Sequence, residues 1–297
     1  MVDLSQSVPM QQSKRYKPVV NAKDGPTQLR HAVEAPFQFS DVPVSLSAGW
    51  VMDPEKRPVV AISYQVNLDA ESAKEDARAE VIGGVANKDG VTVESFSETL
   101  SPPAGALPLT SGSVVLKYIR KYYLEPGLYQ IRVAARDPVT GELGSAWQWI
   151  QVPAKETGKM WLSSIFLREQ SPGSAPADVK LNLDTVTHAR FNIQRRFTPN
   201  SEVNFYVNVH DAAGPDLLIR TAIFQGNQPI IQTPPETITA SPANIEQHIF
   251  PVAGGLSFRD LAPGAYTFEV GITDLFANTQ IIERIPFTVE QNKSSSR

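Results

Sequence analysis

The feature that most constrains the fold of this chain is a long internal repeat. The stretch PGLYQIRVAARD at 126–137 returns as PGAYTFEVGITD at 263–274, and a gapless offset of 137 residues aligns the two. Upstream, 81–100 aligns with 219–238 at an offset of 138. Solenoid repeats are only about 20 to 50 residues long, so a unit of this length can enclose its own core. We therefore expect two similar modules in tandem.

Within each copy, apolar and polar residues alternate. Tyr129, Ile131 and Val133 alternate with Gln130 and Arg132, which is the period of a half-buried strand. Other stretches rich in β-branched and aromatic residues lie between turn signals, and short helical patterns are confined to 27–36 and 71–80. The pattern predicts an all-β fold of two tandem immunoglobulin-like or fibronectin type III-like β-sandwich domains.

The Pro-Gly-x-Tyr element at the start of both repeats has a structural interpretation. Pro-Gly makes a tight corner before a late strand of the sandwich. The tyrosine that follows can turn its ring into the core while its hydroxyl bonds to the backbone upstream, which is the tyrosine-corner arrangement. We therefore assign a structural role to Pro126, Gly127, Tyr129, Pro263, Gly264 and Tyr266.

The repeat also sets the expected domain organisation. With 297 residues, of which 41% are hydrophobic, the chain is long enough for two cores. We predict a polar N-terminal tail at 1–34, a first β-sandwich at 35–154, a second β-sandwich at 155–290 and a disordered tail at 291–297.

Composition excludes several classes of function. The formal net charge is -4 and the pI is near 5.7, so the chain lacks the electropositive surface that nucleic-acid binding requires. The absence of cysteine excludes disulfides, thiolate zinc sites and cysteine nucleophiles. No run reaches the roughly 18 apolar residues of a membrane helix, and the N-terminal stretch has no signal-peptide core. We expect no nucleic-acid partner, no membrane span and no signal peptide in this chain.

Catalytic and metal-binding motifs are also missing from the sequence. There is no GxSxG, no P-loop and no GxGxxG after a strand. The histidines are His31, His188, His210 and His248. None of them has a ligand spacing such as HExxH. We therefore predict that the chain is not an enzyme and has neither a cofactor nor a metal.

Acidic turns leave two alternatives open. The segments 137–142 and 211–216 and the Asp53-Pro-Glu turn each offer one or two carboxylates, whereas calcium takes about 6 to 8 oxygen ligands. We interpret them as ordinary turns. A hydrolase site between the modules would need two carboxylates roughly 5 to 9 Å apart, and no pair in the sequence stands out.

The most distinctive side chains are aromatic. If Ile150 points inward like its repeat counterpart, then Trp147 and Trp149 point outward. A hairpin between 126–137 and 145–152 would place arginines on that same face, suited to cation–π contacts. The face could be covered by the N-terminal tail, the other module or a further domain, or it could be a platform for sugar or peptide. The predicted binding residues are Trp147, Trp149, Arg132 and Arg136.

Residues 124–152 also resemble a known family. The motif PGxYxxRVAxRD, followed by GSAxQ and a Val-Pro pair, is similar to the C-terminal region of the von Willebrand factor type A-related (VWFA-related) proteins of Acidobacteria. The matching residues here are Arg132-Val133-Ala134, Arg136-Asp137, Gly144-Ser145-Ala146, Gln148 and Val152-Pro153. The resemblance covers most of 29–170. The resemblance does not include the type A domain itself, so the metal function of that domain is not carried over.

The resemblance implies a role and a location. It implies a non-catalytic accessory region of a secreted or envelope-associated bacterial protein, acting in protein binding or adhesion or as a structural spacer. Its expected partner is a protein or the upstream type A domain, and its expected location is extracellular or in the cell envelope. The alternative is a carbohydrate-binding module region attached to a hydrolase, with carbohydrate as the partner.

Overall fold

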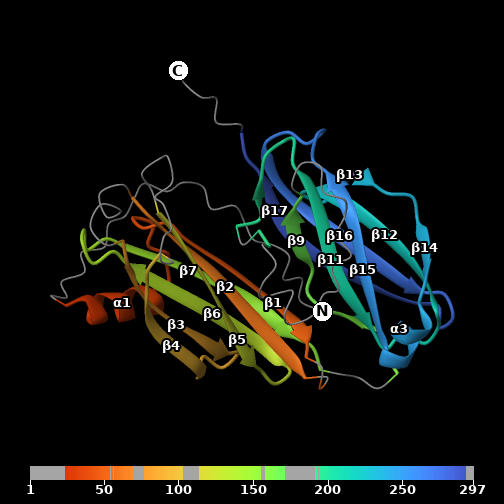
Figure 1. Ribbon diagram of the computed structural model, residues 1–297, viewed down its shortest axis with the longest axis horizontal. Helices are drawn as coiled ribbons and strands as arrows, with labels where there is room; N and C mark the ends of the chain where they lie inside the picture. The colour runs from red at the N-terminus through yellow and green to blue at the C-terminus, as the bar shows by residue number, and fades with distance from the viewer. Residues whose placement is uncertain are drawn as a thin grey trace. The chain divides into compact units, whose positions relative to one another are not determined.

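The computed structural model confirms the expected all-β fold with two immunoglobulin-like or fibronectin type III-like sandwiches (Figure 1). It describes residues 24–53, 55, 57–69, 77–102, 114–154, 158–170, 191–192 and 194–291. His188, the helical pattern over 71–76 and the tail at 292–297 lie outside these residues. Within the described ranges, no helix has the length and apolar character needed to cross a bilayer.

The chain forms two compact units, each described here by itself. The first comprises Met1–Ala48 with Val60–Pro153, and the second comprises Gly49–Val59 with Ala154–Arg297. The expected boundaries were 35–154 and 155–290. The first unit therefore also takes in α1 (Gly25–Glu34), a segment that the sequence placed in the polar tail.

The first sandwich is built from two sheets. One has the order β1-β2-β5 and the other has the order β4-β3-β6-β7. The strands are β1 (Val44–Met52), β2 (Pro58–Leu68), β3 (Ala79–Asn87), β4 (Thr92–Leu100), β5 (Val114–Tyr123), β6 (Gly127–Arg136) and β7 (Leu143–Val152). Alternate residues of β6, among them Ile131 and Val133, are fully buried in the core.

The second sandwich pairs a six-stranded sheet with a four-stranded one. The larger sheet has the order β10-β17-β16-β12-β13, with β14 also on β12, and the smaller has the order β15-β11-β8, with β9 also on β11. The strands are β8 (Trp161–Leu162), β9 (Phe166–Glu169), β10 (Arg196–Phe197), β11 (Glu202–His210), β12 (Asp216–Gln225), β13 (Gln228–Gln232), β14 (Glu236–Thr239), β15 (Ile249–Ser257), β16 (Gly264–Asp274) and β17 (Thr279–Val289). A short helix, α3 (Pro242–Gln247), precedes β15.

Both Pro-Gly-x-Tyr elements have the geometry of a tyrosine corner. The Tyr129 hydroxyl donates to the Glu125 carbonyl oxygen at 2.7 Å, and the Tyr266 hydroxyl donates to that of Ala262 at 2.6 Å. Both rings are buried, at 7% and 4% exposure. The repeat therefore encodes the same local structure in each sandwich, at the entry to β6 and to β16.

Helix α1 begins and packs for identifiable reasons. Asp24 accepts a hydrogen bond from the Thr27 N–H at 2.9 Å as the N-cap, and this bond lowers the pKa of Asp24. Leu29 and Ala32, three residues apart and therefore on one face of the helix, are buried against a cluster that includes Ala134 and Leu143. The helix thus lies on the β4-β3-β6-β7 sheet.

Candidate functional site

The candidate site lies on the outer face of the β4-β3-β6-β7 sheet. Strands β6 and β7 pair as an antiparallel hairpin, with Arg132 opposite Trp147 and Gln130 opposite Trp149. Directly paired residues share a face of a sheet, so these four side chains lie together. The hairpin and the shared face agree with the pattern predicted from the sequence.

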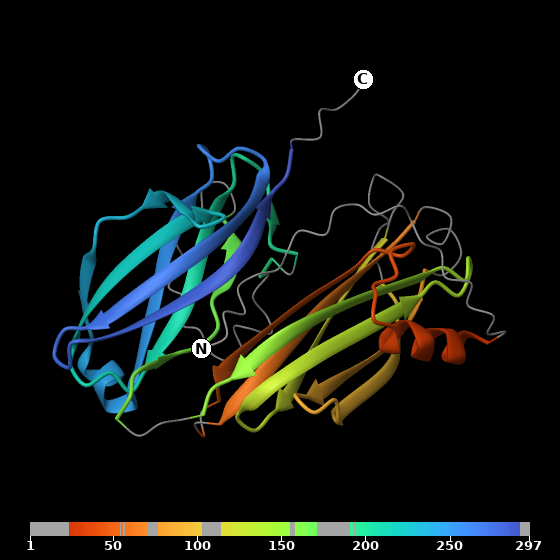
Figure 2. The same ribbon diagram turned by 180° about the vertical axis from the view of Figure 1, so that it is seen from behind.

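Helix α1 covers only one end of this outer face. It contacts β6, β7 and β3, and Figure 2 shows it in red against one end of their sheet. Under it, Ala134 is fully buried and Leu143 is 6% exposed. The exposed part of the face begins farther along β7, at Trp147.

Trp147 and Trp149 are exposed at 39% and 43%. They are two residues apart on one strand, so their Cα atoms are roughly 7 Å apart. Neither indole makes a hydrogen bond or a ring contact with a residue that the structure describes. We call these two side chains, with the flanking Gln130 and Gln151, the tryptophan face.

The Arg132 side chain forms its hydrogen bonds with the end of α1 and not with the tryptophans. Its Nη1 donates to the carbonyl oxygens of Val33, Glu34 and Ala35 at 3.1, 3.2 and 2.9 Å. These carbonyls are at the C-terminal end of α1, where the helix has no internal donors left and its dipole favours a cation. The Arg132 Nε donates to Gln130 Oε1 at 2.8 Å. None of its contacts within the described residues is to an indole ring.

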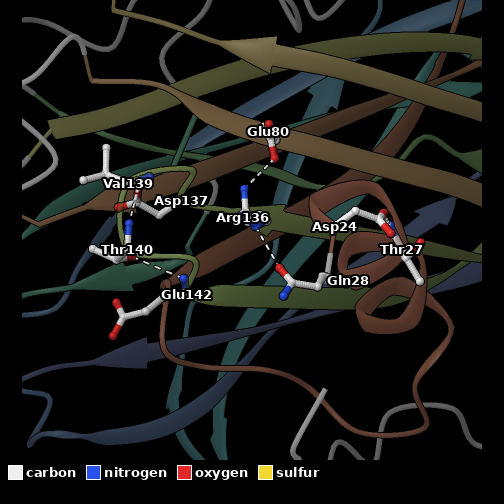
Figure 3. A network of polar contacts seen from close by, with 9 residues as sticks. All are labelled: Asp24, Thr27, Gln28, Glu80, Arg136, Asp137, Val139, Thr140 and Glu142. Atoms are coloured by element: carbon white, nitrogen blue, oxygen red, sulfur yellow. Dashed lines mark hydrogen bonds and ion pairs between the residues drawn. The ribbon is translucent and has the colours of Figure 1, made fainter. Parts of the chain in front are cut away.

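Arg136 holds the other side of the same helix (Figure 3). Its Nε donates to Gln28 Oε1 at 2.9 Å, and its Nη1 forms an ion pair with Glu80 Oε2 at 3.1 Å. Both arginines therefore lie on the predicted face but fasten α1 to the sheet. The aromatic part of the predicted binding set is exposed, whereas its guanidinium groups are occupied.

The second sandwich shows how the repeat fills the same positions. At the offset of 137 residues, Arg284 corresponds to Trp147 and Glu269 corresponds to Arg132. These two are paired across β16 and β17 and form an ion pair with 2.6 Å between Arg284 Nη2 and Glu269 Oε2. The Arg284 guanidinium also lies over the Phe224 ring at 5.3 Å. The fold therefore has no need of tryptophan at this position.

The role of α1 is the functional feature that sequence reasoning missed. The sequence predicts a short helix over 27–36 but treats 1–34 as a tail. The usable signal was the spacing of Leu29 and Ala32, a small apolar stripe on an otherwise polar helix. A stripe of two residues does not say which surface it meets, so the packing could not be read from it.

Each histidine that the structure describes either packs against an aromatic ring or caps a helix. His31 lies edge-on to Phe39, with ring centroids 6.4 Å apart, and His248 caps α3 in the left-handed conformation. The His210 ring stacks on Trp161 at 3.9 Å with an interplanar angle of 7°. The described ranges hold no group of three or more His, Asp or Glu side chains placed to bind a metal ion.

The carboxylates of the acidic turns accept hydrogen bonds from N–H groups of the protein. Asp137 Oδ1 accepts the Val139 N–H at 2.8 Å, and Asp211 Oδ2 accepts the Trp161 Nε1–H at 2.9 Å. Asp53 accepts the Arg57 backbone N–H and forms an ion pair with its guanidinium. These contacts agree with the interpretation of the three segments as ordinary turns. The tryptophan face therefore remains the candidate site.

Comparison with known proteins adds little beyond this geometry. No protein-family model matches the chain, and no curated protein matches it. Among solved structures, the chain is similar to the fibronectin(III)-like modules of Clostridium thermocellum CbhA, with 11% identity over 86% of this chain and 98% of that chain. The TM-score is 0.24, a likeness that bears on neither ligand nor partner.

Proposed function

We propose that this chain is a non-catalytic binding region of a secreted or envelope-associated bacterial protein, with the tryptophan face as its contact surface. The observation that carries the proposal is the exposure of Trp147 and Trp149 side by side on one rigid strand. Exposed apolar patches on folded domains usually mark contacts, and tryptophan is enriched among the residues that dominate binding energy.

The internal repeat supports a functional reason for these tryptophans. The corresponding positions of the second sandwich carry Arg284 and Pro286, and Arg284 is satisfied by its ion pair with Glu269. At 39% and 43% exposure, both indoles leave apolar area in water that adds nothing to the stability of the fold. The presence of these tryptophans in only one of the two similar sheets is expected if they bind a partner and are not required by the sandwich fold.

The partner that this surface fits best is another protein domain. Trp147 and Trp149 offer flat aromatic area, and the nearest cation, Arg132, is already bound to α1. Recognition would therefore depend on aromatic burial more than on charge. The resemblance of 124–152 to VWFA-related proteins makes a type A domain our first choice of partner, with this chain as its accessory region.

Carbohydrate is the second candidate, and the amides beside the tryptophans favour it. Gln130 lies opposite Trp149, and Gln151 follows on the same outer row of β7 with an exposed side chain. An indole can stack on the apolar face of a sugar ring while neutral amides bind its hydroxyls. This arrangement would make the chain a carbohydrate-binding region attached to a hydrolase.

Calorimetric titration separates the two candidates. The wild-type chain, a Trp147→Ala/Trp149→Ala variant and an Arg284→Ala control at the equivalent position would each be titrated with a VWFA-related type A domain, and with cellohexaose and xylohexaose. We expect binding of the type A domain that the double variant loses and the control keeps. Binding of a hexaose with the same pattern would establish the carbohydrate function instead. If every probe binds wild type and double variant equally, or none binds at all, the proposal is wrong.

A further inference from the structure

The edge of the β4-β3-β6-β7 sheet at β7 is occupied over only the first half of the strand. The Val42 N–H donates to the Leu143 carbonyl oxygen at 3.1 Å, and the Ser145 N–H donates to that of Phe39 at 2.9 Å. Residues 39–42 therefore lie along the start of β7 as an extended segment. From Phe39 toward the N-terminus, the chain leads to α1 on the outer face of the sheet and so leaves the edge.

The second half of this edge, over residues 147–151, has unpaired main-chain groups. Alternate residues of a strand direct their N–H and C=O groups to the same side. Those of Trp147, Trp149 and Gln151 therefore point to the edge that the preceding segment occupies farther back. Within the part of the chain that the structure describes, these edge groups form no hydrogen bond. The three side chains are exposed, so this half of the edge can accept a further strand.

Strand β1 is joined to β7 by a side chain and does not close this edge. The Gln148 side chain accepts a hydrogen bond from the Ala48 N–H at 3.0 Å and donates one to the Ala48 carbonyl oxygen at 3.2 Å. Gln148 belongs to the row of β7 that points away from the two tryptophans, and β1 pairs with β2 in the other sheet. The link therefore uses the inner face of β7 and none of its edge groups.

The sequence of β7 also lacks the usual guards of an exposed edge. Edge strands are commonly protected by charged side chains, proline or a bulge. The ten residues of β7 include no charged residue and no proline, and the pairing with β6 keeps one register over all ten pairs. The unpaired half is only about five residues long and is bounded by residues 39–42. This length suits a short extended segment better than the edge of a second folded sheet.

The corresponding stretch of the second sandwich is guarded. At the offset of 137 residues, Pro286 of β17 corresponds to Trp149, and Glu283 corresponds to Ala146. Proline has no N–H to offer at an edge. Glu283 is paired with the buried Val270 and so lies in the inner row of β17, where a charge hinders the approach of another strand. Both guards are missing from β7.

Where these guards end, β17 binds an added strand. The Thr288 N–H donates to the Arg195 carbonyl oxygen and the Glu290 N–H donates to that of Phe197, both at 2.8 Å, and β10 pairs there in parallel. Thr288 corresponds to Gln151 at the offset of 137. This position of the repeated fold thus holds a short extended segment in the second sandwich and offers the equivalent groups unpaired in the first.

We propose that residues 147–151 of β7 bind an extended segment of a partner protein as an added strand. Main-chain hydrogen bonds to the unpaired edge groups hold the segment. Trp147 and Trp149 follow each other in one outer row at about 7 Å, which is also the spacing of alternate side chains in an extended peptide. Uncharged side chains of the segment can therefore pack against both indoles. This inference rests on the proposed function and adds the way in which the partner is recognised.

A library of linear peptides displayed on phage supplies the probe for this test. Selection on the wild-type chain, with depletion on Trp147→Ala/Trp149→Ala, should yield peptides that need the tryptophan face. Each selected peptide would then be synthesised with one N-methyl group at each position in turn. We expect N-methylation to weaken binding at least about tenfold at every second residue, where the N–H faces β7, and to have little effect between them. Failure to select any such peptide, or N-methyl effects without alternation, would overturn strand addition.

Two variants of Gln151 separate this inference from the proposed function. Gln151→Pro and Gln151→Ala both lose the side-chain amide, but only proline removes the N–H at the edge. We expect Gln151→Pro to raise the dissociation constants of the selected peptides and of a VWFA-related type A domain at least about tenfold, and Gln151→Ala to change them less than about twofold. Urea denaturation of both variants checks that they fold, and the N-methyl series needs no variant.

The two ideas fail in different ways. If binding of the type A domain or of a hexaose is lost in Trp147→Ala/Trp149→Ala but is equal in Gln151→Pro and Gln151→Ala, the tryptophan face is a binding surface and strand addition is wrong. Selected peptides that bind Gln151→Pro as tightly as Gln151→Ala also contradict strand addition. If the tryptophan variant binds every probe as the wild type does, the proposed function and this inference are both wrong.

Discussion

The Arg132 guanidinium lies 2.9 Å from the carbonyl oxygen of Ala35, which ties the end of α1 to the middle of β6 across 97 residues of sequence. Arg136 makes the second attachment through Gln28. One face of a single hairpin thus holds a helix at one end and leaves two tryptophans exposed at the other.

Replacing Arg132 should release the helix. Arg132→Met removes the donors to three carbonyls at the C-terminal end of α1, and hydrogen bonds to charged groups contribute about 1.5 to 3 kcal/mol. We expect faster amide hydrogen exchange over 25–35 with little change in the strands. The control Arg284→Met, which breaks the Glu269 ion pair of the second sandwich, should leave exchange in α1 as it is. Unchanged protection of α1 in Arg132→Met would contradict the attachment.

Each tyrosine corner should stabilise its own sandwich independently of the other. Tyr129→Phe and Tyr266→Phe each remove one hydroxyl that donates to a backbone carbonyl. Such a bond contributes about 1 kcal/mol. We expect each variant to lower the unfolding free energy of its own sandwich by about that amount, measured by urea denaturation, and the double variant to show both losses. A variant that keeps the wild-type urea midpoint would show that its hydroxyl bond does not stabilise the corner.

Asp274 should make the second sandwich sensitive to acid. Burial alone would raise its pKa, but N–H donors of Ala277, Ala213, Phe276 and Gly214 outweigh that effect and place the pKa below its ordinary value of 3.8. A lowered folded-state pKa gives stability that is complete above the unfolded pKa and is lost as pH falls through the folded one.

Asp274→Asn tests this assignment. The variant should lose about 1 to 3 kcal/mol at pH 7, because the amide nitrogen would face N–H donors. Its deficit relative to wild type should shrink as pH falls from about 5 to below 3.8, as followed by urea denaturation at several pH values. A deficit that stays constant over this range would contradict the charge-based role.

Gly144 should be intolerant of a side chain, because the backbone of residues 40–42 lies directly against β7 at this position. A Cβ at this position would lie 1.8 Å from the Val42 carbonyl oxygen. We expect Gly144→Ala to cost more than about 2 kcal/mol, since backbone must move. Gly255→Ala is the matched control, because its Cβ would meet only Asn204 Oδ1 at 3.8 Å. Equal urea midpoints for the two variants would contradict the close approach at Val42.

The fold was predictable from the sequence because its evidence is repeated and local. The same alternation and the same Pro-Gly-x-Tyr corner appear twice, and either copy alone indicates a sandwich strand. The outward direction of Trp147 and Trp149 followed from the period of two and agrees with their exposure. These inferences need only neighbours in the chain or in one hairpin.

The contacts of Arg132 and the two edges of the sheet were not predictable in the same way. Arg132 binds carbonyls that are 97 to 99 residues away, and nothing in its own strand indicates them. Similarly, β4 and the β13–β14 pair align in sequence, but only the sheet order shows that both are edges. The cation–π contact expected for Arg132 is not formed, because its guanidinium instead donates hydrogen bonds to three carbonyl oxygens at the end of α1.

Iodide quenching of tryptophan fluorescence tests the central claim most directly. Of the four tryptophans, Trp50 is 5% exposed, whereas Trp147 and Trp149 are 39% and 43% exposed. The fourth, Trp161, is half-buried and stacks on His210. We predict strong quenching of the wild-type chain and loss of most of the quenchable emission in Trp147→Ala/Trp149→Ala. We also predict protection of the wild-type emission when a bound partner covers the tryptophan face. Equal quenching of wild type and double variant, or a bound partner that leaves the quenching unchanged, would contradict the assignment of this surface.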